Sequence, residues 1–183
     1  MRMLRENVGF AEEKRSELGL EQIMAVALLL AAGAVLKFFI GSLFAVGMKP
    51  NFIIAMYCLA ILLVKPTLKE ALIIGLLAGA VCQFFPGTPY INFISEAAGA
   101  LFIAFAERIT PRKMFFRPAV LTFFATAVSG IVFLLFLKTL FLANSSGASL
   151  SVFGAIIAGT AAVNAVIVQM LFIPLSKAMS RLR

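Results

Sequence analysis

Residues 118–142 read PAVLTFFATAVSGIVFLLFLKTLFL and contain a single charged residue, Lys138. A helix needs about 20 predominantly apolar residues to cross the hydrocarbon core of a bilayer, so this stretch is long enough to span a membrane. Five further apolar runs cover roughly residues 20–40, 51–64, 68–85, 90–106 and 151–175, and turn residues separate them. The sequence therefore predicts an all-α membrane protein with six transmembrane helices in a compact bundle.

The composition of the whole chain supports this class. Of the 183 residues, 62% are apolar and 13% are charged, whereas soluble domains average about 45–50% apolar and about 25% charged residues. The chain contains no Asp, His or Trp, and its two cysteines, Cys58 and Cys82, both lie inside apolar runs. These absences exclude Ser-His-Asp and Cys-His catalysis and the usual nitrogen-and-carboxylate metal sites. We expect no enzyme activity, no metal and no cofactor, and we interpret both cysteines as buried packing residues.

Positive charge predicts how the chain is oriented. Residues 1–19 read as a polar cytoplasmic segment, and residues 20–183 as a single six-helix transmembrane domain. Thirteen of the 16 Lys and Arg residues lie in the N-terminal segment, the second and fourth loops, and the C-terminal tail. Positively charged loops are retained in the cytoplasm, so both termini should be cytoplasmic. Membrane topology accounts for the net charge of +8, and no nucleic-acid partner is expected.

A carboxylate inside the fourth run marks the candidate binding site. Glu96 lies roughly 9 Å along the helix from its outer end and shares a helix face with Asn92 and Ser95. A charge at this depth is costly unless it faces a partner or a wet cavity. Further polar groups should lie beneath the same outer loops: Lys49, Asn51, Gln83 and Tyr90. Lys49 and Glu96 in an aromatic pocket would suit a zwitterion with an aromatic body, whereas the structural alternative is that Glu96 only pairs with a lysine.

Other polar and small residues have simpler interpretations. Lys37 and Lys138 lie near outer helix ends, where a long side chain can snorkel to the interface. Asn164 and Gln169 are expected to form hydrogen bonds between helices, and Gly75 with Gly79 is expected to form an internal helix contact.

Several short motifs, taken in order, carry a family resemblance. They are GMKPN at 47–51, IIGL at 73–76 with Gly79, FPG at 85–87, INFI at 91–94 and AVN at 162–164. Together they resemble the TrpP-type tryptophan transport family, whose members look like the substrate-binding S components of energy-coupling factor (ECF) transporters. The resemblance implies six helices, a ligand pocket under the outer loops, and a surface at Ala27 and Ala31 that docks on a shared transmembrane subunit.

The function expected on this basis is capture of a small solute. The resemblance implies that the solute is tryptophan, taken from outside a prokaryotic cell membrane and imported with partner subunits that hydrolyse ATP. One alternative is an S component for another small aromatic or vitamin-like ligand. Another is a structural or assembly membrane protein, in which Glu96 and Lys49 merely pair.

Overall fold

The computed structural model describes residues 18–43, 51–86, 88, 90–111, 113–140 and 147–180. These residues form helices and connecting turns, with no strand among them. The helices follow one another along the chain as α1 Leu20–Leu43, α2 Phe52–Val64, α3 Leu68–Cys82, α4 Ile91–Ile109, α5 Arg117–Leu140 and α6 Gly147–Ser180. Each apolar run in the sequence corresponds to one helix, so the all-α prediction is confirmed.

Three of the described helices are long and apolar enough to cross a membrane: Leu20–Phe39 within α1, Arg117–Leu140, and Ser151–Met179 within α6. By contrast, α2 is apolar but has only 13 residues, about 20 Å of helix against a hydrocarbon core of about 30 Å. Three described helices of this length and composition indicate a multi-pass membrane protein. The count of six spans and the cytoplasmic position of both termini stay predictions.

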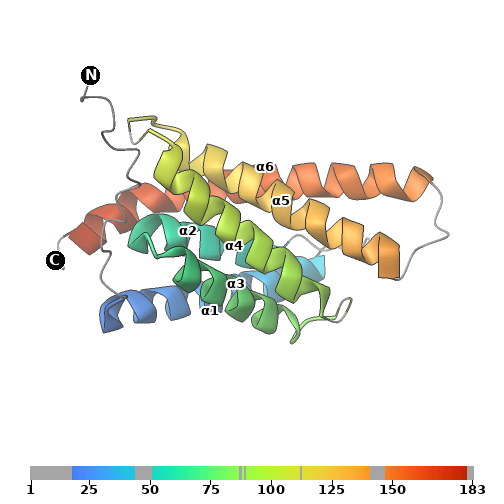
Figure 1. Ribbon diagram of the computed structural model, residues 1–183, viewed down its shortest axis with the longest axis horizontal. Helices are drawn as coiled ribbons and strands as arrows, with labels where there is room; N and C mark the ends of the chain where they lie inside the picture. Colours follow the sequence, from blue (N-terminus) through green and yellow to red (C-terminus); the bar gives the residue numbers. More distant parts are fainter. Residues whose placement is uncertain are drawn as a thin grey trace, which may run out of the picture.

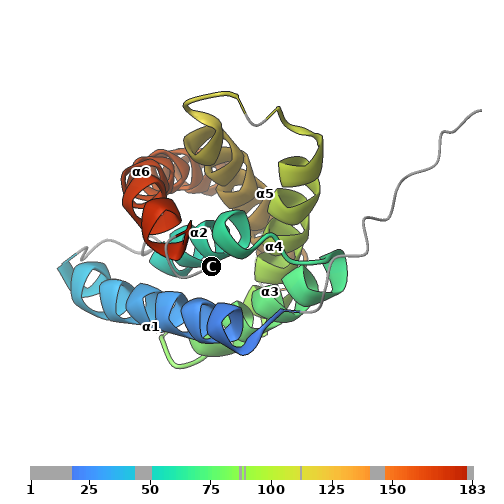
Figure 2. The ribbon, with the colours of Figure 1, turned by 90° about the vertical axis from the view of Figure 1, so that its left-hand side faces the viewer.

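The centre of the bundle is α2. It contacts each of the other five helices, and the view along the bundle shows it enclosed by them (Figure 2). All of its residues except Leu63 are buried, and Tyr57, Cys58 and Ile61 are wholly inaccessible. The interpretation of Cys58 as a packing residue is therefore confirmed. The shortest helix is α2, and it begins only at Phe52. It therefore leaves a space between the longer helices next to its N-terminal end.

Two glycines bring α3 and α4 into close contact. A Cβ atom added at Gly75 would lie 2.7 Å from the Cα of Ala97, and one at Gly79 would lie 2.7 Å from the Cα of Phe93. Neither site has room for a methyl group, so the glycines permit the approach of the two backbones. The predicted internal contact is confirmed. It also positions Glu96, whose backbone oxygen would lie 2.8 Å from a Cβ at Gly75.

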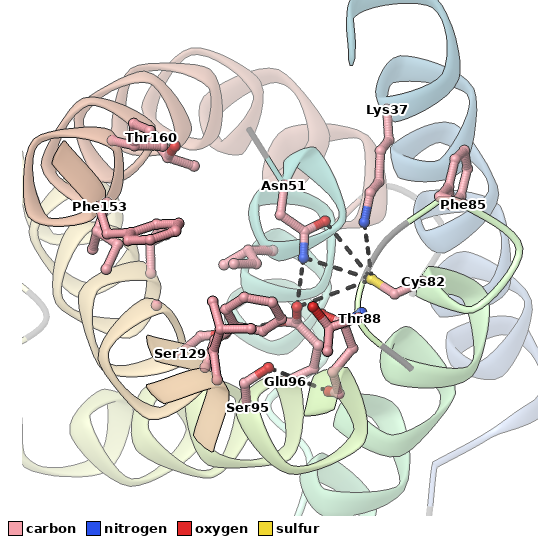
Figure 3. Close-up of a pocket in the computed structure, with 18 of the residues that line it drawn as sticks. Lys37, Asn51, Cys82, Phe85, Thr88, Ser95, Glu96, Ser129, Phe153 and Thr160 are labelled. Carbon is pink, nitrogen blue, oxygen red and sulfur yellow. Dashed lines mark hydrogen bonds between the residues drawn. The ribbon is translucent and has the colours of Figure 1, made fainter. Parts of the chain in front are cut away.

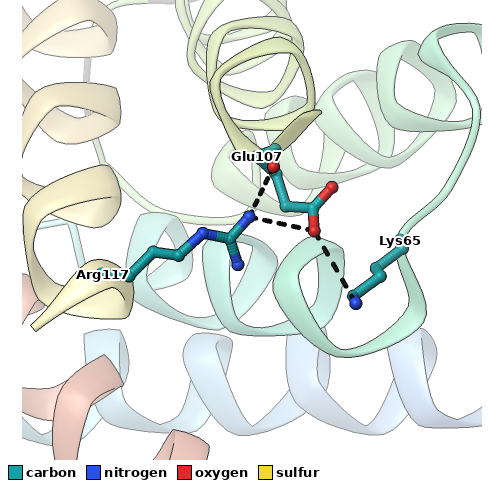
Figure 4. A network of polar contacts seen from close by, with 3 residues as sticks. All are labelled: Lys65, Glu107 and Arg117. Carbon is teal, nitrogen blue, oxygen red and sulfur yellow. Dashed lines mark hydrogen bonds and ion pairs between the residues drawn. The ribbon is translucent and has the colours of Figure 1, made fainter. Parts of the chain in front are cut away.

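At one end of the bundle α1 begins and α6 ends (Figure 1), and here a buried carboxylate joins three helices. The Glu107 Oε1 lies 3.1 Å from the Nη2 of Arg117 and 3.9 Å from the Nζ of Lys65. Arg117 also donates a hydrogen bond to the backbone oxygen of Glu107 (Figure 4). Because a buried charge is stable only when paired, this network holds the end of α2, the end of α4 and the start of α5 together.

A capping box fixes the start of α3 at the same end. The Thr67 amide donates to the Glu70 Oε2 at 2.7 Å, and the Glu70 amide donates to the Thr67 Oγ1 at 3.3 Å. The Glu70 Oε1 also accepts a hydrogen bond from the Leu18 amide at 2.9 Å. The chain entering α1 is thereby tied to the first turn of α3.

Candidate functional site

A cavity of about 850 Å³ lies at the opposite end of the bundle, within the range of about 300–1,000 Å³ that is usual for small-molecule sites. The walls come from the second half of α1, the start of α2 with Asn51 before it, and the end of α3 with the residues that follow it. The first two turns of α4 and the facing halves of α5 and α6 complete them. The cavity is therefore the space left by the late start of α2. Figure 3 shows its polar side chains gathered around Glu96, with Phe153 and Thr160 of α6 across the cavity.

Glu96 is buried, with 1% of its surface exposed, and its carboxylate is hydrogen-bonded on both oxygens. The Oε1 accepts from the Nδ2 of Asn51, directly before α2, and the Oε2 accepts from the Oγ of Ser129 on α5 at 3.1 Å. These bonds offset part of the cost of removing the carboxylate from water. Three helices therefore converge on one acidic group that lines the cavity.

Lys37 brings a positive charge to the same cavity. Its Nζ donates to the Sγ of Cys82 at 3.3 Å and lies 5.2 Å from the centre of the Phe85 ring, a distance at which a cation is attracted to an aromatic face. The Cys82 Sγ in turn lies 4.0 Å from the Glu96 Oε1. In the described part of the chain no ion pair joins Lys37 to Glu96. The two opposite charges are separated by the thiol.

Two residues that the sequence analysis did not assign to the site line the cavity. Cys82 is buried, as expected, and Lys37, which was expected to snorkel to the interface, lies in the cavity wall. Their positions depend on which face of α1 meets the end of α3, and hydropathy alone does not report this because both helices are apolar around most of their circumference.

The predicted binding residues divide into three groups. Asn51, Asn92, Ser95 and Glu96 line the cavity. Gln83 and Tyr90 do not: they are exposed, and the Gln83 Oε1 accepts a hydrogen bond from the Tyr90 amide at 3.2 Å, which stabilises the connection between α3 and α4. Lys49 lies outside the described residues.

Sequence reasoning did not identify the wall formed by α5 and α6. Thr126 and Ser129 of α5 and Thr160 of α6 supply hydroxyl groups, and Phe133 and Phe153 supply aromatic rings. Small polar residues three apart inside the long apolar run at 118–142 were the available signal, since they mark one helix face.

The predicted hydrogen bonds between helices are present. Asn164 of α6 donates to the backbone oxygen of Asn51 at 3.2 Å and to the Oγ1 of Thr126 at 3.4 Å. Gln169 donates to the backbone oxygen of Phe115 at 3.1 Å and accepts from the amide of Ala119 at 3.2 Å. Asn164 thereby holds the backbone that carries Asn51 against α5 and α6, directly below the cavity.

The side chains around the cavity are of kinds that can hold a small molecule through charge, hydrogen bonds and ring contacts. The described residues contain no group of three or more His, Cys, Asp or Glu side chains that could hold a metal ion. The cavity instead offers one carboxylate, one ammonium group, several hydroxyl and amide groups, and the rings of Phe38, Phe85, Phe133 and Phe153. Such a set can complement a small molecule that carries both charges and an aromatic part.

Comparison with known proteins agrees with this chemistry. The family model described as tryptophan transporter TrpP matches residues 19–180. The chain belongs to the TrpP family. A relative in Bacillus subtilis (strain 168), named "Probable tryptophan transport protein", is 31% identical over 150 residues, which cover 80% of this chain and 85% of the relative. No solved structure matches the chain. Membership of the TrpP family indicates a membrane transport protein for tryptophan rather than an enzyme.

Proposed function

We propose that this TrpP-family chain is the substrate-binding S component of an ECF-type importer and that the cavity beside Glu96 binds tryptophan from outside the cell. The observation that carries the proposal is the placement of Lys37 and Glu96 in one aromatic-lined cavity, with a thiol between them. Two charges that only stabilised the fold would be expected to pair directly. Separated charges can each bind one end of a zwitterion.

Each part of tryptophan has a proposed partner. The α-ammonium group binds the Glu96 carboxylate, with Asn51 and Ser129 holding that carboxylate in place. The α-carboxylate binds the Lys37 ammonium group, and Lys49 remains in the proposal as a second cation. Asn92 and Ser95 border the charged end, and the indole ring packs against the rings of Phe38 and Phe85. A hydrogen bond to a charged group contributes about 1.5–3 kcal/mol, so the two ends together can account for selective binding.

The distribution of basic residues supports an outward-facing cavity. Among the described residues, one end of the bundle carries Lys65, Lys69, Arg108, Lys113, Arg117 and Lys177, and the cavity end carries Lys37 and Lys138. The positive-inside tendency places the first end in the cytoplasm. Tryptophan would then enter from outside.

Partner subunits complete the proposal. The chain lacks a phosphate-binding loop of the Walker A type, so ATP-driven uptake requires subunits that hydrolyse ATP. Ala27 and Ala31 are exposed on α1, and their small side chains would let a helix of the ECF transmembrane subunit approach closely. The setting we propose is a prokaryotic cell membrane.

Ligands that lack one charge test the proposal. The full-length chain is purified in detergent, and binding is measured by calorimetry and by ligand fluorescence, for which a chain without Trp gives a low background. The ligands are tryptophan, tryptamine, which lacks the carboxylate, and indole-3-propionate, which lacks the ammonium group. The variants are Glu96→Gln and Lys37→Met, and the control is Lys138→Met, an exposed lysine at the same end that does not line the cavity.

The expected result is selective. Glu96→Gln should lower the affinity for tryptophan and for tryptamine by about 10-fold to 150-fold and leave the affinity for indole-3-propionate unchanged. Lys37→Met should lower the affinity for tryptophan and for indole-3-propionate and leave the affinity for tryptamine unchanged. Equal losses for all three ligands in both variants would instead support a structural role for the charges. Failure of tryptophan to bind the parent chain would favour another ligand or an assembly role.

A further inference from the structure

The cavity is larger than tryptophan requires. A water molecule occupies roughly 30 Å³ in the liquid. If each of the about fifteen non-hydrogen atoms of tryptophan took the same volume, the whole molecule would fill only about 450 Å³. The cavity measures about 850 Å³. About half of it is therefore left over when one tryptophan molecule is bound as proposed above.

The extra space lies along α5 and α6. The lining residues of α5 extend from Thr126 to Leu137, a length of about 16 Å. Ser129, which binds the Glu96 carboxylate, lies near the beginning of this row. From Ser129 to Leu137 the wall continues for about 12 Å. A ligand whose ammonium group is held at Glu96 therefore has a long wall of α5 beyond it.

This part of the wall is apolar on both helices. A Cβ at Gly130 would lie 2.9 Å from the side chain of Ile157, which fixes how the two helices face each other. Toward the end of α5 and the start of α6, the wall is lined by Phe133 and Leu137 of α5 and by Val152, Phe153 and Ile156 of α6. None of them can form a hydrogen bond through its side chain. The region is suited to hydrocarbon or aromatic groups.

The far end of this region is also accessible. Val152 is 59% exposed although it lines the cavity, and Phe153 and Ile156 are partly exposed. Among the described residues, the side chains at this end of the region are therefore only partly enclosed.

We infer that the apolar region between α5 and α6 is a second subsite, which accepts indole amino acids carrying a bulky apolar substituent on the benzo ring. This inference rests on the proposed function, because it uses Glu96 and Lys37 to hold the amino-acid end. The substituent extends along Phe133 and Ile156 and replaces water there, and apolar burial makes the exchange favourable.

The probe is 5-benzyloxytryptophan, measured against tryptophan on the full-length chain in detergent. The parent chain should bind the probe within about tenfold of its affinity for tryptophan, because the substituent gains apolar contacts. Ile156→Phe adds bulk to the subsite, and it should leave tryptophan binding within about threefold while weakening the probe by about thirtyfold or more. Leu137→Phe makes the same test from the facing helix. Val163→Phe is the matched control, since Val163 is on α6 and exposed but does not line the cavity.

Each outcome decides between the proposals. Retained tryptophan binding in the filled variants demonstrates that they are folded. If the parent chain binds tryptophan and rejects the probe, the subsite is overturned and the proposed function stands. If Ile156→Phe and Val163→Phe change probe binding equally, the subsite is also overturned. If neither ligand binds the parent chain, the proposed function fails and this inference fails with it.

Discussion

Replacing Gly75 by alanine should separate α3 from α4 and destabilise the bundle. The added Cβ would lie 2.7 Å from the Cα of Ala97, 2.8 Å from the Cβ of Ala100 and 2.8 Å from the backbone oxygen of Glu96. Two of these atoms belong to the backbone, so relief requires a shift of the helix rather than a side-chain rotation. Overpacking of this kind costs about 1–3 kcal/mol.

A second glycine isolates this cost. Alanine favours a helix over glycine by about 1 kcal/mol, which would mask part of the effect. Gly159, inside α6, has nothing within 4 Å of an added Cβ, so Gly159→Ala receives the same benefit without the collision. The difference between the two variants should therefore equal the overpacking cost, about 1–3 kcal/mol in favour of Gly159→Ala.

The assay is reversible unfolding in mixed micelles with increasing SDS, followed by circular dichroism, for the parent chain and both variants. Gly159→Ala should be as stable as the parent or more stable, and Gly75→Ala should be clearly less stable. Because the shifted helix carries Glu96, tryptophan affinity should fall in Gly75→Ala alone. Equal stability of the two variants would refute the close approach of α3 and α4 at this point.

Three other predictions concern the opposite end, the orientation and the partner surface. Arg117→Met should lower the unfolding free energy by about 3–5 kcal/mol because it leaves buried Glu107 without its close partner. The double variant Arg117→Met with Glu107→Leu should recover most of this loss in the same SDS titration. A double variant no more stable than the single one would contradict this prediction. Reporters fused after the last residue and in the connection between α4 and α5 should both read as cytoplasmic, and an external signal from either would reverse the proposed orientation. The double variant Ala27→Trp with Ala31→Trp should keep its ligand affinity in detergent, measured by calorimetry, but should lose co-purification with the energising subunits and uptake in cells. Loss of ligand affinity as well would mean that the alanines pack internally.

The positions of the helices could be read from the sequence because they depend on local properties. A run of apolar residues long enough to favour a helix, ended by residues such as Pro66 or Thr110, needs no knowledge of its neighbours. Glu96 could be found in the same way. A carboxylate inside an apolar run needs a compensating environment wherever the run is placed, and the structure supplies that environment with Asn51 and Ser129.

Only the tertiary structure decided which side chains share the cavity. Lys37 and Cys82 enter it, whereas Gln83 and Tyr90 remain at the surface, although nothing in their own segments distinguishes the two pairs. In a soluble protein the apolar stripe of a helix identifies its inner face. Here lipid and protein interior are both apolar, so the outward face of α1 is as hydrophobic as the inward one. The hydropathy pattern of the helix therefore does not indicate which face is buried. That choice depends on packing: the short central α2, the glycine contact between α3 and α4, and the register of α5 against α6.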